Sequence, residues 1–334
     1  MELVKPKRLS QGDTIRIVAP ASNMASLAKS AVDRGVENLE KLGFIVEIDP
    51  NVYRSYKGTA GRSLERAESL MEAFLDDSVD GIMCCWGGFN SNDIIDYLDY
   101  QAIKENSKVF VGYSDITILN TVLYKEAGLV SFQGPAFITF THEFLMPWEI
   151  DVFKHVTMTS EVPLELKAAP KYIDDPFFWQ HPEKPVEENQ NPGWNIVRGG
   201  EAEGRLVCGH LGTLLSLAGT KYWPDFKKHI LIIEVCEGDI GANYVIRQLR
   251  HLKHLGVFDV ISGLIVGRTP EVLGLKGDQT IESLLEDISG ESEIPIVTQF
   301  DFGHTNPIAT IPIGVWGRIS AEKKALTLLE AGVR

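Results

Sequence analysis

The chain contains the segment Val109-Phe110-Val111-Gly112-Tyr113-Ser114-Asp115, in which a short apolar run leads through a turn into the start of a helical pattern. Similar apolar runs and helical patterns alternate from residue 15 to residue 128. This alternation is typical of a parallel sheet with helices on both faces. We therefore expect an N-terminal α/β domain. Its expected strands span 15–19, 44–48, 81–86 and 109–112, and its expected helices span 27–42, 63–75, 92–98 and 115–126.

The regular alternation ends near residue 140, and residues 163–193 are rich in Pro, Glu, Lys and aromatic side chains without a clear period. A second set of apolar segments follows Gly204 and has more β character. The length of 334 residues also favours two domains. We expect an N-terminal α/β domain over 1–165, a linker with an aromatic loop over 166–198, and a mixed, β-rich C-terminal domain over 199–334.

Composition excludes several classes of partner. The net charge of -14, from 32 basic and 46 acidic side chains, opposes binding to nucleic acids and to anionic membranes. No apolar run is long enough to span a membrane, and the first residues lack a signal peptide's apolar region, so we expect a cytoplasmic protein. The four cysteines form no C-x-x-C pair, no H-E-x-x-H motif is present, and we expect no metal site.

Ser114 is the first candidate for catalysis. It follows the expected strand 109–112, at the carboxyl end where open α/β sheets place their ligands. The turn resembles the nucleophile elbow of other hydrolases, although the G-x-S-x-G pattern is absent. N–H groups at the start of the next helix could stabilise an oxyanion. The alternative is that Ser114 only caps that helix, because serine is a common N-cap.

The segment from Trp86 to Asn92 also links an expected strand to an expected helix. Its glycines, Gly87 and Gly88, would let the backbone approach a ligand and supply a second oxyanion donor. The alternative is an ordinary glycine turn in which Asn92 caps a helix. The preceding Cys84-Cys85 pair lies inside the expected strand, so we expect two buried side chains rather than a nucleophile.

An acid and a histidine complete the set of candidates. Glu234 directly follows the apolar run 230–233, and an acid at a buried strand end needs a partner. Glu237 is its rival, but on an extended chain it faces the other way and adjoins Gly238-Asp239, which has the composition of an exposed turn. His304 lies in a loop between apolar stretches, where a general base is expected, although the chain holds eight histidines.

Taken together and in this order, these segments resemble the LD-carboxypeptidase family of serine peptidases, which includes the microcin C immunity proteins. The resemblance covers nearly the whole chain, and no single motif is specific. The segments that carry it are 12–22, 87–92, 112–115, 134–135, 232–234, 263–268 and 302–304.

The resemblance implies a catalytic triad of Ser114 as nucleophile, His304 as general base and Glu234 as the residue that orients the histidine. It implies oxyanion donors at Gly88 and Asp115. It also implies an active site between the two domains, a homodimer, and no metal or organic cofactor. The substrate-binding residues that we expect are Gly87, Phe89, Asn90, Trp179, Trp194 and His210.

One segment departs from the family pattern. The family usually has Gly-Gly-Asn-Leu where this chain has Cys208-Gly209-His210-Leu211, which leaves the shape of the pocket open. The long loop with Phe177, Phe178, Trp179 and Trp194 resembles the microcin C immunity branch, because a tryptophan face can stack on a nucleobase. The alternative is that the tryptophans only attach the loop to the protein body.

We therefore expect hydrolysis of the amide or acyl-sulfamate bond of aminoacyl-nucleotide analogues. Release of D-alanine from a murein tetrapeptide by an LD-carboxypeptidase is the alternative. Two other classes are a non-catalytic protein that binds a small ligand and an amidotransferase-like cysteine enzyme. The first would not require Ser114, Glu234 and His304 together, and the second would require a cysteine at residue 114.

Overall fold

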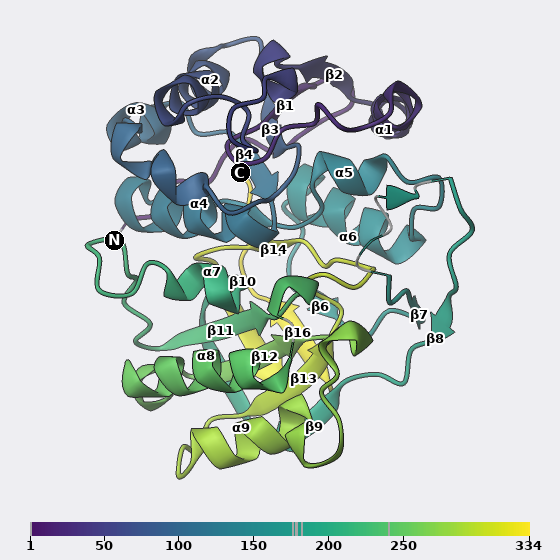
Figure 1. The fold of residues 1–334 in the computed structure, drawn as a ribbon. Helices are drawn as coiled ribbons and strands as arrows, with labels where there is room; N and C mark the ends of the chain where they lie inside the picture. The colour runs from purple at the N-terminus through teal and green to yellow at the C-terminus, as the bar shows by residue number, and fades with distance from the viewer. Residues whose placement is uncertain (1, 176, 178–179, 182, 240) are drawn as a thin grey trace.

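The computed structural model describes residues 2–175, 177, 180–181, 183–239 and 241–334. In this part of the chain, two large β-sheets form two domains, which lie one above the other in Figure 1. The purple and blue N-terminal domain is at the top, and the green and yellow C-terminal domain is below it. A small hairpin of β7 (Lys171–Tyr172) and β8 (Asn189–Gln190) lies at the side.

The N-terminal sheet has the strand order β14-β5-β4-β3-β1-β2, and all neighbours from β5 to β2 are parallel. Ile17 of β1 packs in one buried cluster with Leu39 of α1, whereas Ile82 of β3 packs in a second cluster with Leu70 of α2. The parallel sheet covered on both faces is thus confirmed. The strands are β1 (Thr14–Val18), β2 (Ile45–Ile48), β3 (Gly81–Cys84), β4 (Val109–Gly112), β5 (Phe132–Gln133) and β14 (Ile311–Pro312). The helices are α1 (Lys29–Lys41), α2 (Ser63–Leu75), α3 (Tyr100–Glu105), α4 (Thr117–Val122), α5 (Phe137–Phe140) and α6 (Pro147–Met158).

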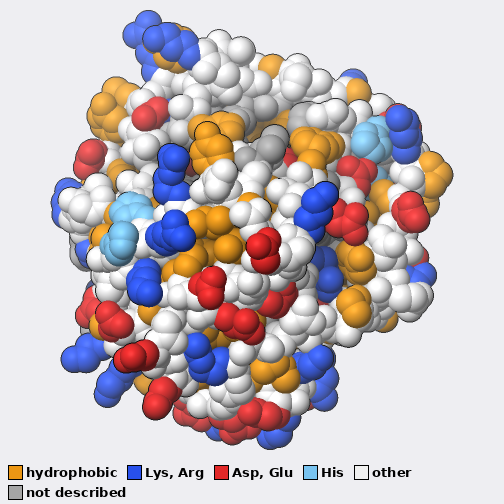
Figure 2. Space-filling model, turned by 60° about the horizontal axis from the view of Figure 1, so that its bottom comes forward, with side chains coloured by type: hydrophobic (Ala, Val, Ile, Leu, Met, Phe, Trp, Pro, Cys, Tyr) orange, Lys and Arg blue, Asp and Glu red, His pale blue; other side chains and the backbone are white. Residues whose placement is uncertain are grey.

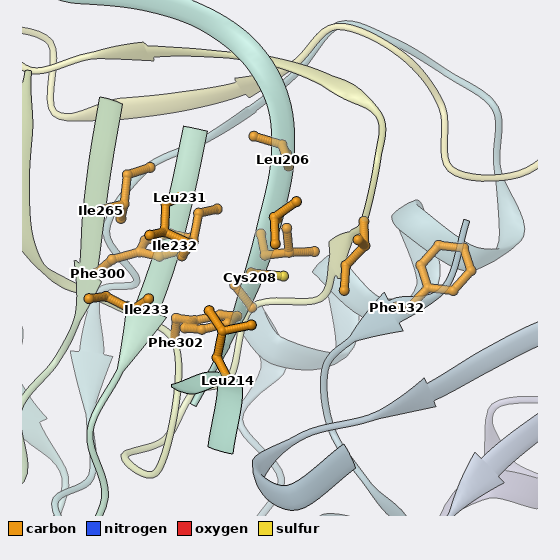
Figure 3. Packing of buried hydrophobic residues seen from close by; sticks show 14 of the residues in the cluster. Phe132, Leu206, Cys208, Leu214, Leu231, Ile232, Ile233, Ile265, Phe300 and Phe302 are labelled. Atoms are coloured by element: carbon orange, nitrogen blue, oxygen red, sulfur yellow. The ribbon is translucent and has the colours of Figure 1, made fainter. Parts of the chain in front are cut away.

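The C-terminal sheet has the order β6-β16-β15-β10-β11-β12-β13-β9, with a parallel centre from β10 to β13 and antiparallel pairs outside it. Its central strand β11 is buried along its whole length, and Figure 3 shows Leu231, Ile232 and Ile233 packed with Phe300 and Phe302. The strands are β6 (Leu164–Leu166), β9 (Asn195–Arg198), β10 (Glu201–His210), β11 (His229–Glu234), β12 (Gly263–Gly267), β13 (Ile296–Phe300), β15 (Trp316–Ser320) and β16 (Ala325–Leu328). The helices are α7 (Leu211–Leu215), α8 (Ala242–His254) and α9 (Ile281–Ser289).

The two domains are joined by more than one connection. After β13 in the lower sheet, the chain crosses to β14, which pairs antiparallel with β5 in the upper sheet. The end of β10 also meets α4, because the N–H of His210 donates to Thr117 Oγ1 at 2.9 Å. A Cβ at Gly209 would lie 2.2 Å from Thr117 Cγ2, so only glycine allows this approach. The carboxyl ends of β4 and β10 and the loop after β13 are therefore held close together.

The predicted linker 166–198 contains strand residues that belong to the C-terminal sheet. The strands β6 and β9 lie in or beside that segment, yet both belong to the C-terminal sheet. Polar contacts attach two further residues of this segment to the same domain: Asp301 accepts from the N–H of Ala169 at 2.9 Å, and Arg268 donates to Asn191 at 2.7 Å. Isolated polar and aromatic residues in the sequence gave no period for these contacts, so the segment was misread as a linker.

The predicted helix 92–98 is also wrong, because two 3₁₀ turns, Ser91–Asp93 and Ile95–Tyr97, occupy this region. The carboxylate of Asp115 accepts hydrogen bonds from the N–H groups of Asn90 and Ser91, each at 2.8 Å. These bonds hold the start of the segment against the neighbouring loop rather than in a regular helix.

The surface carries charges of both signs. On the face shown in Figure 2, acidic and basic side chains are interspersed, with apolar side chains between them. Among the described residues, no helix combines the length and the apolar character that crossing a lipid bilayer would require.

Candidate active site

Ser114 lies in a strained turn at the carboxyl end of β4. Its φ is 63°, a left-handed conformation that costs a residue other than glycine about 1–3 kcal/mol and that clusters at functional sites. Ile116, not Ser114, occupies the N-cap position of α4, so the alternative of a simple cap does not describe this serine. The turn instead exposes the Ser114 hydroxyl, as in a nucleophile elbow.

A chain of two hydrogen bonds links the three predicted triad residues. His304 Nδ1 lies 2.9 Å from Glu234 Oε2, and His304 Nε2 lies 3.1 Å from Ser114 Oγ. A carboxylate can only accept, so Nδ1–H donates to Glu234 and Nε2 of the neutral ring accepts from the Ser114 hydroxyl. The structure thus brings these side chains together in the geometry that proton transfer from the serine requires.

The elements that carry the acid and the histidine explain this arrangement. Glu234 is the last residue of β11 and is fully buried. His304 lies in the loop that crosses from β13 to β14. Before it, Gly303 has φ 109°, and a Cβ there would lie 2.7 Å from Glu234 Cβ. Glycine at 303 therefore lets the histidine loop rest directly on the acid.

The surroundings of His304 favour its charged form. Burial lowers the pKa of His304, but the charge and hydrogen bond of Glu234, with the charges of Glu237 and Asp239, outweigh burial and raise the pKa to about 8. Glu234 Oε1 has no hydrogen-bond partner among the described residues, so the bond from His304 to Oε2 is the side-chain hydrogen bond that this carboxylate accepts there. Such an acid stabilises the imidazolium that forms when the histidine takes a proton.

The backbone beside Ser114 leaves space for an oxyanion. A Cβ at Gly87 would lie 3.0 Å from Ser114 Oγ and 3.3 Å from the backbone nitrogen of Asp115. The missing side chain thus leaves an opening next to both the hydroxyl and a predicted oxyanion donor. Gly88, the other predicted oxyanion donor, is the next residue after Gly87 and has a φ of 148°, which L side chains rarely adopt. Burial raises the pKa of the Asp115 carboxyl, and the N–H groups of Ser91 and Asn90 oppose that rise while fixing the loop.

A cleft of about 660 Å³ opens over Ser114 and His304. The predicted residues Gly87, Gly88, Phe89 and His210 line it. Phe89 is 88% exposed and Phe177 37% exposed, so both present aromatic faces at the cleft. Asn90 is not among the described lining residues, and its N–H is bound by Asp115.

Trp194 does not have the predicted role in substrate binding. It precedes β9, is 0% exposed, and packs edge-to-face on Phe300 with ring centroids 4.9 Å apart. The edge strand β9 draws this tryptophan into the core of the C-terminal domain, which the sequence did not reveal because β9 was expected to be part of a loop. The predicted substrate contact Trp179 and its neighbour Phe178 lie outside the described residues.

A second histidine–acid pair, which the sequence did not reveal, lies beside the triad. His210 Nδ1 accepts from the N–H of Thr213, so Nε2–H donates to Asp239 Oδ2 at 2.8 Å. Burial raises the pKa of Asp239, but the hydrogen bond and charge of His210 outweigh it and lower the pKa to about 2. Asp239 is 6% exposed rather than part of an exposed turn, because the chain turns sharply after β11.

Two groups of side chains near the triad have ligand atoms within 4.8 Å of one another, as a metal ion would require. They share Cys236, which is half-buried at the cleft, and are His210–Cys236–Asp239 and Cys236–Glu237–His304. Both groups contain a histidine nitrogen that is hydrogen-bonded within the site. A metal ion would therefore have to replace these hydrogen bonds.

The strained serine, the histidine and the buried acid have the arrangement found in serine hydrolases. Residues 15–134 match the LD-carboxypeptidase N-terminal domain, and residues 203–319 match the LD-carboxypeptidase C-terminal domain. The chain belongs to the LD-carboxypeptidase family and is a peptidase-type hydrolase.

Several curated relatives extend over nearly the whole chain. The Bacillus subtilis protein named "Putative carboxypeptidase YocD" is 35% identical and covers 94% of this chain and 95% of its own length. The Bacillus subtilis protein named "Probable murein peptide carboxypeptidase" is 31% identical, with 98% and 95% covered. The Escherichia coli microcin C7 self-immunity protein MccF is 30% identical, with 96% and 94% covered.

Solved structures show the same fold. An MccF-like protein from Bacillus anthracis superposes with a TM-score of 0.90 at 32% identity, covering 97% of this chain and 99% of its own. MccF in complex with aspartyl sulfamoyl adenosine has a TM-score of 0.90 at 28% identity, covering 99% and 100%. An active-site mutant of MccF, in which a serine, an asparagine and a lysine are each replaced by alanine, has a TM-score of 0.91 with the same identity and coverage.

Proposed function

We propose that this peptidase uses Ser114, His304 and Glu234 as a catalytic triad and hydrolyses the amide or acyl-sulfamate bond of aminoacyl-nucleotide analogues. The observation that carries the triad is the continuous hydrogen-bonded path from Ser114 Oγ through the His304 ring to Glu234 Oε2, with distances of 3.1 and 2.9 Å. The strained turn at Ser114 supports the same role.

In this mechanism, Ser114 Oγ attacks the acyl carbon while His304 Nε2 takes the hydroxyl proton. Glu234 stabilises the resulting imidazolium through Nδ1–H. The N–H groups of Asp115 and Gly88 receive the oxyanion beside Gly87. His304 then gives its proton to the leaving nitrogen, and the acyl-enzyme that remains is hydrolysed by water in the reverse sequence of proton transfers.

Two observations support the nucleotide-like substrate. Phe89 and Phe177 offer exposed rings at the cleft, and a nucleobase stacked on an aromatic ring gains about 1–3 kcal/mol. Solved structures of MccF contain aspartyl sulfamoyl adenosine and adenosine monophosphate. The sequence suggested Trp179 and Trp194 for stacking on the nucleobase; Trp194 is buried, and Phe89 and Phe177 fill that role in this proposal.

A murein peptide is the second candidate substrate, because one relative over nearly the full chain is named for that activity. The deciding assay offers the enzyme aspartyl sulfamoyl adenosine and a murein tetrapeptide in parallel. Release of sulfamoyl adenosine that falls at least fivefold in Phe89→Ala supports the nucleotide substrate. If the enzyme releases D-alanine from the tetrapeptide and does not cleave aspartyl sulfamoyl adenosine, the nucleotide substrate is contradicted and the carboxypeptidase activity is supported.

A further inference from the structure

Glu237 has no role in the proposed triad, yet it faces the same cleft. A carboxylate oxygen of Glu237 lies within 4.8 Å of a His304 ring nitrogen and of Cys236 Sγ. Its Oε2 is buried and has no hydrogen-bond partner among the described residues. The sequence suggested that Glu237 would point away from Glu234, but the chain leaves the strand after Glu234 and turns through the 3₁₀ segment Glu237–Asp239.

The neighbouring acids are already committed to other partners. Asp239 accepts from His210, from the N–H of Cys236 and from Gln248. Glu234 accepts from His304. A buried carboxylate oxygen without a donor is unfavourable by about 1–3 kcal/mol or more. Glu234 Oε1 also lacks a donor among the described residues, but Glu234 is fully buried and does not line the cleft, so Glu237 is the acid there that a ligand can reach.

The charge of the cleft determines which donor fits. Among the described lining residues, Glu237 is the only acidic side chain, and there is neither a lysine nor an arginine. The MccF active-site mutant, by contrast, has a lysine among the replaced residues. A substrate carboxylate placed directly beside Glu237 would meet a like charge with no lysine or arginine next to it among the described lining residues, whereas an ammonium group placed there would form a charge-assisted hydrogen bond.

The position of Glu237 indicates where the ammonium group lies. The α-nitrogen of an aminoacyl group is about 2.5 Å from the carbonyl carbon. A carbonyl carbon attacked by Ser114 lies close to His304, whose Nε2 is 3.1 Å from Ser114 Oγ. An α-ammonium group on that carbonyl is therefore within reach of the Glu237 carboxylate.

We propose that Glu237 forms a subsite for an ammonium group next to the scissile carbonyl, so that the enzyme selects acyl groups with a free α-amine. This inference rests on the proposed hydrolysis of aminoacyl-nucleotide analogues and names the feature of the acyl group that is recognised. It also predicts poor use of substrates whose α-amine is blocked or replaced by a neutral group.

The test uses two probes of nearly equal size, alanyl sulfamoyl adenosine and lactyl sulfamoyl adenosine, which carry an α-ammonium and an α-hydroxyl group respectively. Binding is measured by calorimetry to Ser114→Ala, which prevents turnover. We expect the alanyl probe to bind about 10- to 100-fold more tightly, because a hydrogen bond between charged groups replaces a neutral one. Glu237→Gln, added to Ser114→Ala, should reduce this ratio to below threefold.

Glu271→Gln is the matched control. Glu271 is an exposed acid whose 3₁₀ turn packs near that of Glu237, but it does not line the cleft. Glu271→Gln removes one negative charge, as Glu237→Gln does, and should leave the ratio of the two probes' affinities unchanged. An equal affinity for both probes, a ratio that survives Glu237→Gln, or the failure of both probes to bind would overturn the subsite.

The enzyme with Ser114 intact separates this inference from the proposed function. If it hydrolyses the alanyl probe but Glu237→Gln leaves the preference unchanged, the subsite is wrong and the triad stands. If both probes bind in a Glu237-dependent ratio but neither is hydrolysed, the proposed reaction is wrong and the subsite stands. As a second readout, loss of the Glu237 charge should shift the acidic limb of the pH–rate profile to lower pH, since this charge raises the pKa of His304.

Discussion

Gly87→Ala is expected to abolish most of the hydrolytic activity while the protein remains folded. The new Cβ would lie 2.8 Å from Cβ and 3.0 Å from Oγ of Ser114, and 3.3 Å from the backbone nitrogen of Asp115. It would thus occupy the space between the nucleophile and an oxyanion donor. Gly87 is not among the residues with positive φ, so alanine can adopt its backbone conformation.

The expected loss in kcat is at least about 10²- to 10³-fold, or about 3–4 kcal/mol of transition-state stabilisation, which is typical of losing one oxyanion donor. Steady-state kinetics on aspartyl sulfamoyl adenosine measure this loss, and circular dichroism with thermal unfolding verifies the fold. Gly238→Ala is the matched control, because Gly238 lines the same cleft and, among the described residues, the new Cβ would meet only Cys236 Sγ, at 3.3 Å. If Gly87→Ala keeps activity within threefold of the native enzyme, the assignment of the oxyanion site is wrong.

Three further predictions concern the acid, the pH dependence and the core. Glu234→Gln should reduce the rate constant for hydrolysis by about 10⁴-fold in single-turnover assays, because the amide no longer holds the histidine tautomer. A larger loss in Glu237→Gln would show that Glu237, not Glu234, orients the histidine. The pKa of His304 is raised from 6.5 to about 8, so kcat/KM should rise with pH through about 8 as the histidine becomes a neutral base. The stabilisation from the charged His304–Glu234 pair should be complete below pH 6.5 and be lost as pH rises through about 8. A His304→Ala variant whose unfolding free energy falls by the same amount over this pH range would refute this. Trp194→Ala should lower the free energy of unfolding by about 3–5 kcal/mol in urea titrations but leave KM unchanged at a temperature where the variant is folded, whereas a large rise in KM would restore its role in substrate binding.

Much of the sheet architecture could be predicted because buried parallel strands are short apolar runs. The expected strand 109–112 coincides with β4, and the apolar run 230–233 lies within β11. The strand β14 could not be predicted in the same way, since it has two residues and pairs with β5 from a distant part of the chain. Only the folded chain shows that this pairing carries the His304 loop across the domain junction.

The candidate site was predicted unevenly for a similar reason. Glu234 directly follows an apolar run and Ser114 lies two residues after another, so their positions near strand ends could be predicted from the sequence. Asp239 and Glu237 lie beyond a turn whose direction the sequence did not specify, and both face the site in the structure. Trp194 was misassigned because an aromatic side chain in a polar segment has the same sequence signature whether it stacks on a ligand or packs in the core.

The identity of the nucleophile is the central claim, and covalent labelling tests it most directly. The enzyme is treated with a fluorophosphonate, digested and analysed by mass spectrometry, with Ser114→Ala and His304→Ala as controls. We predict a single labelled peptide modified at Ser114, no labelling in Ser114→Ala, and labelling slowed at least about 100-fold in His304→Ala, because the serine then lacks its general base. Stoichiometric labelling at another serine, or a folded Ser114→Ala enzyme with activity within tenfold of the native one, would contradict the account.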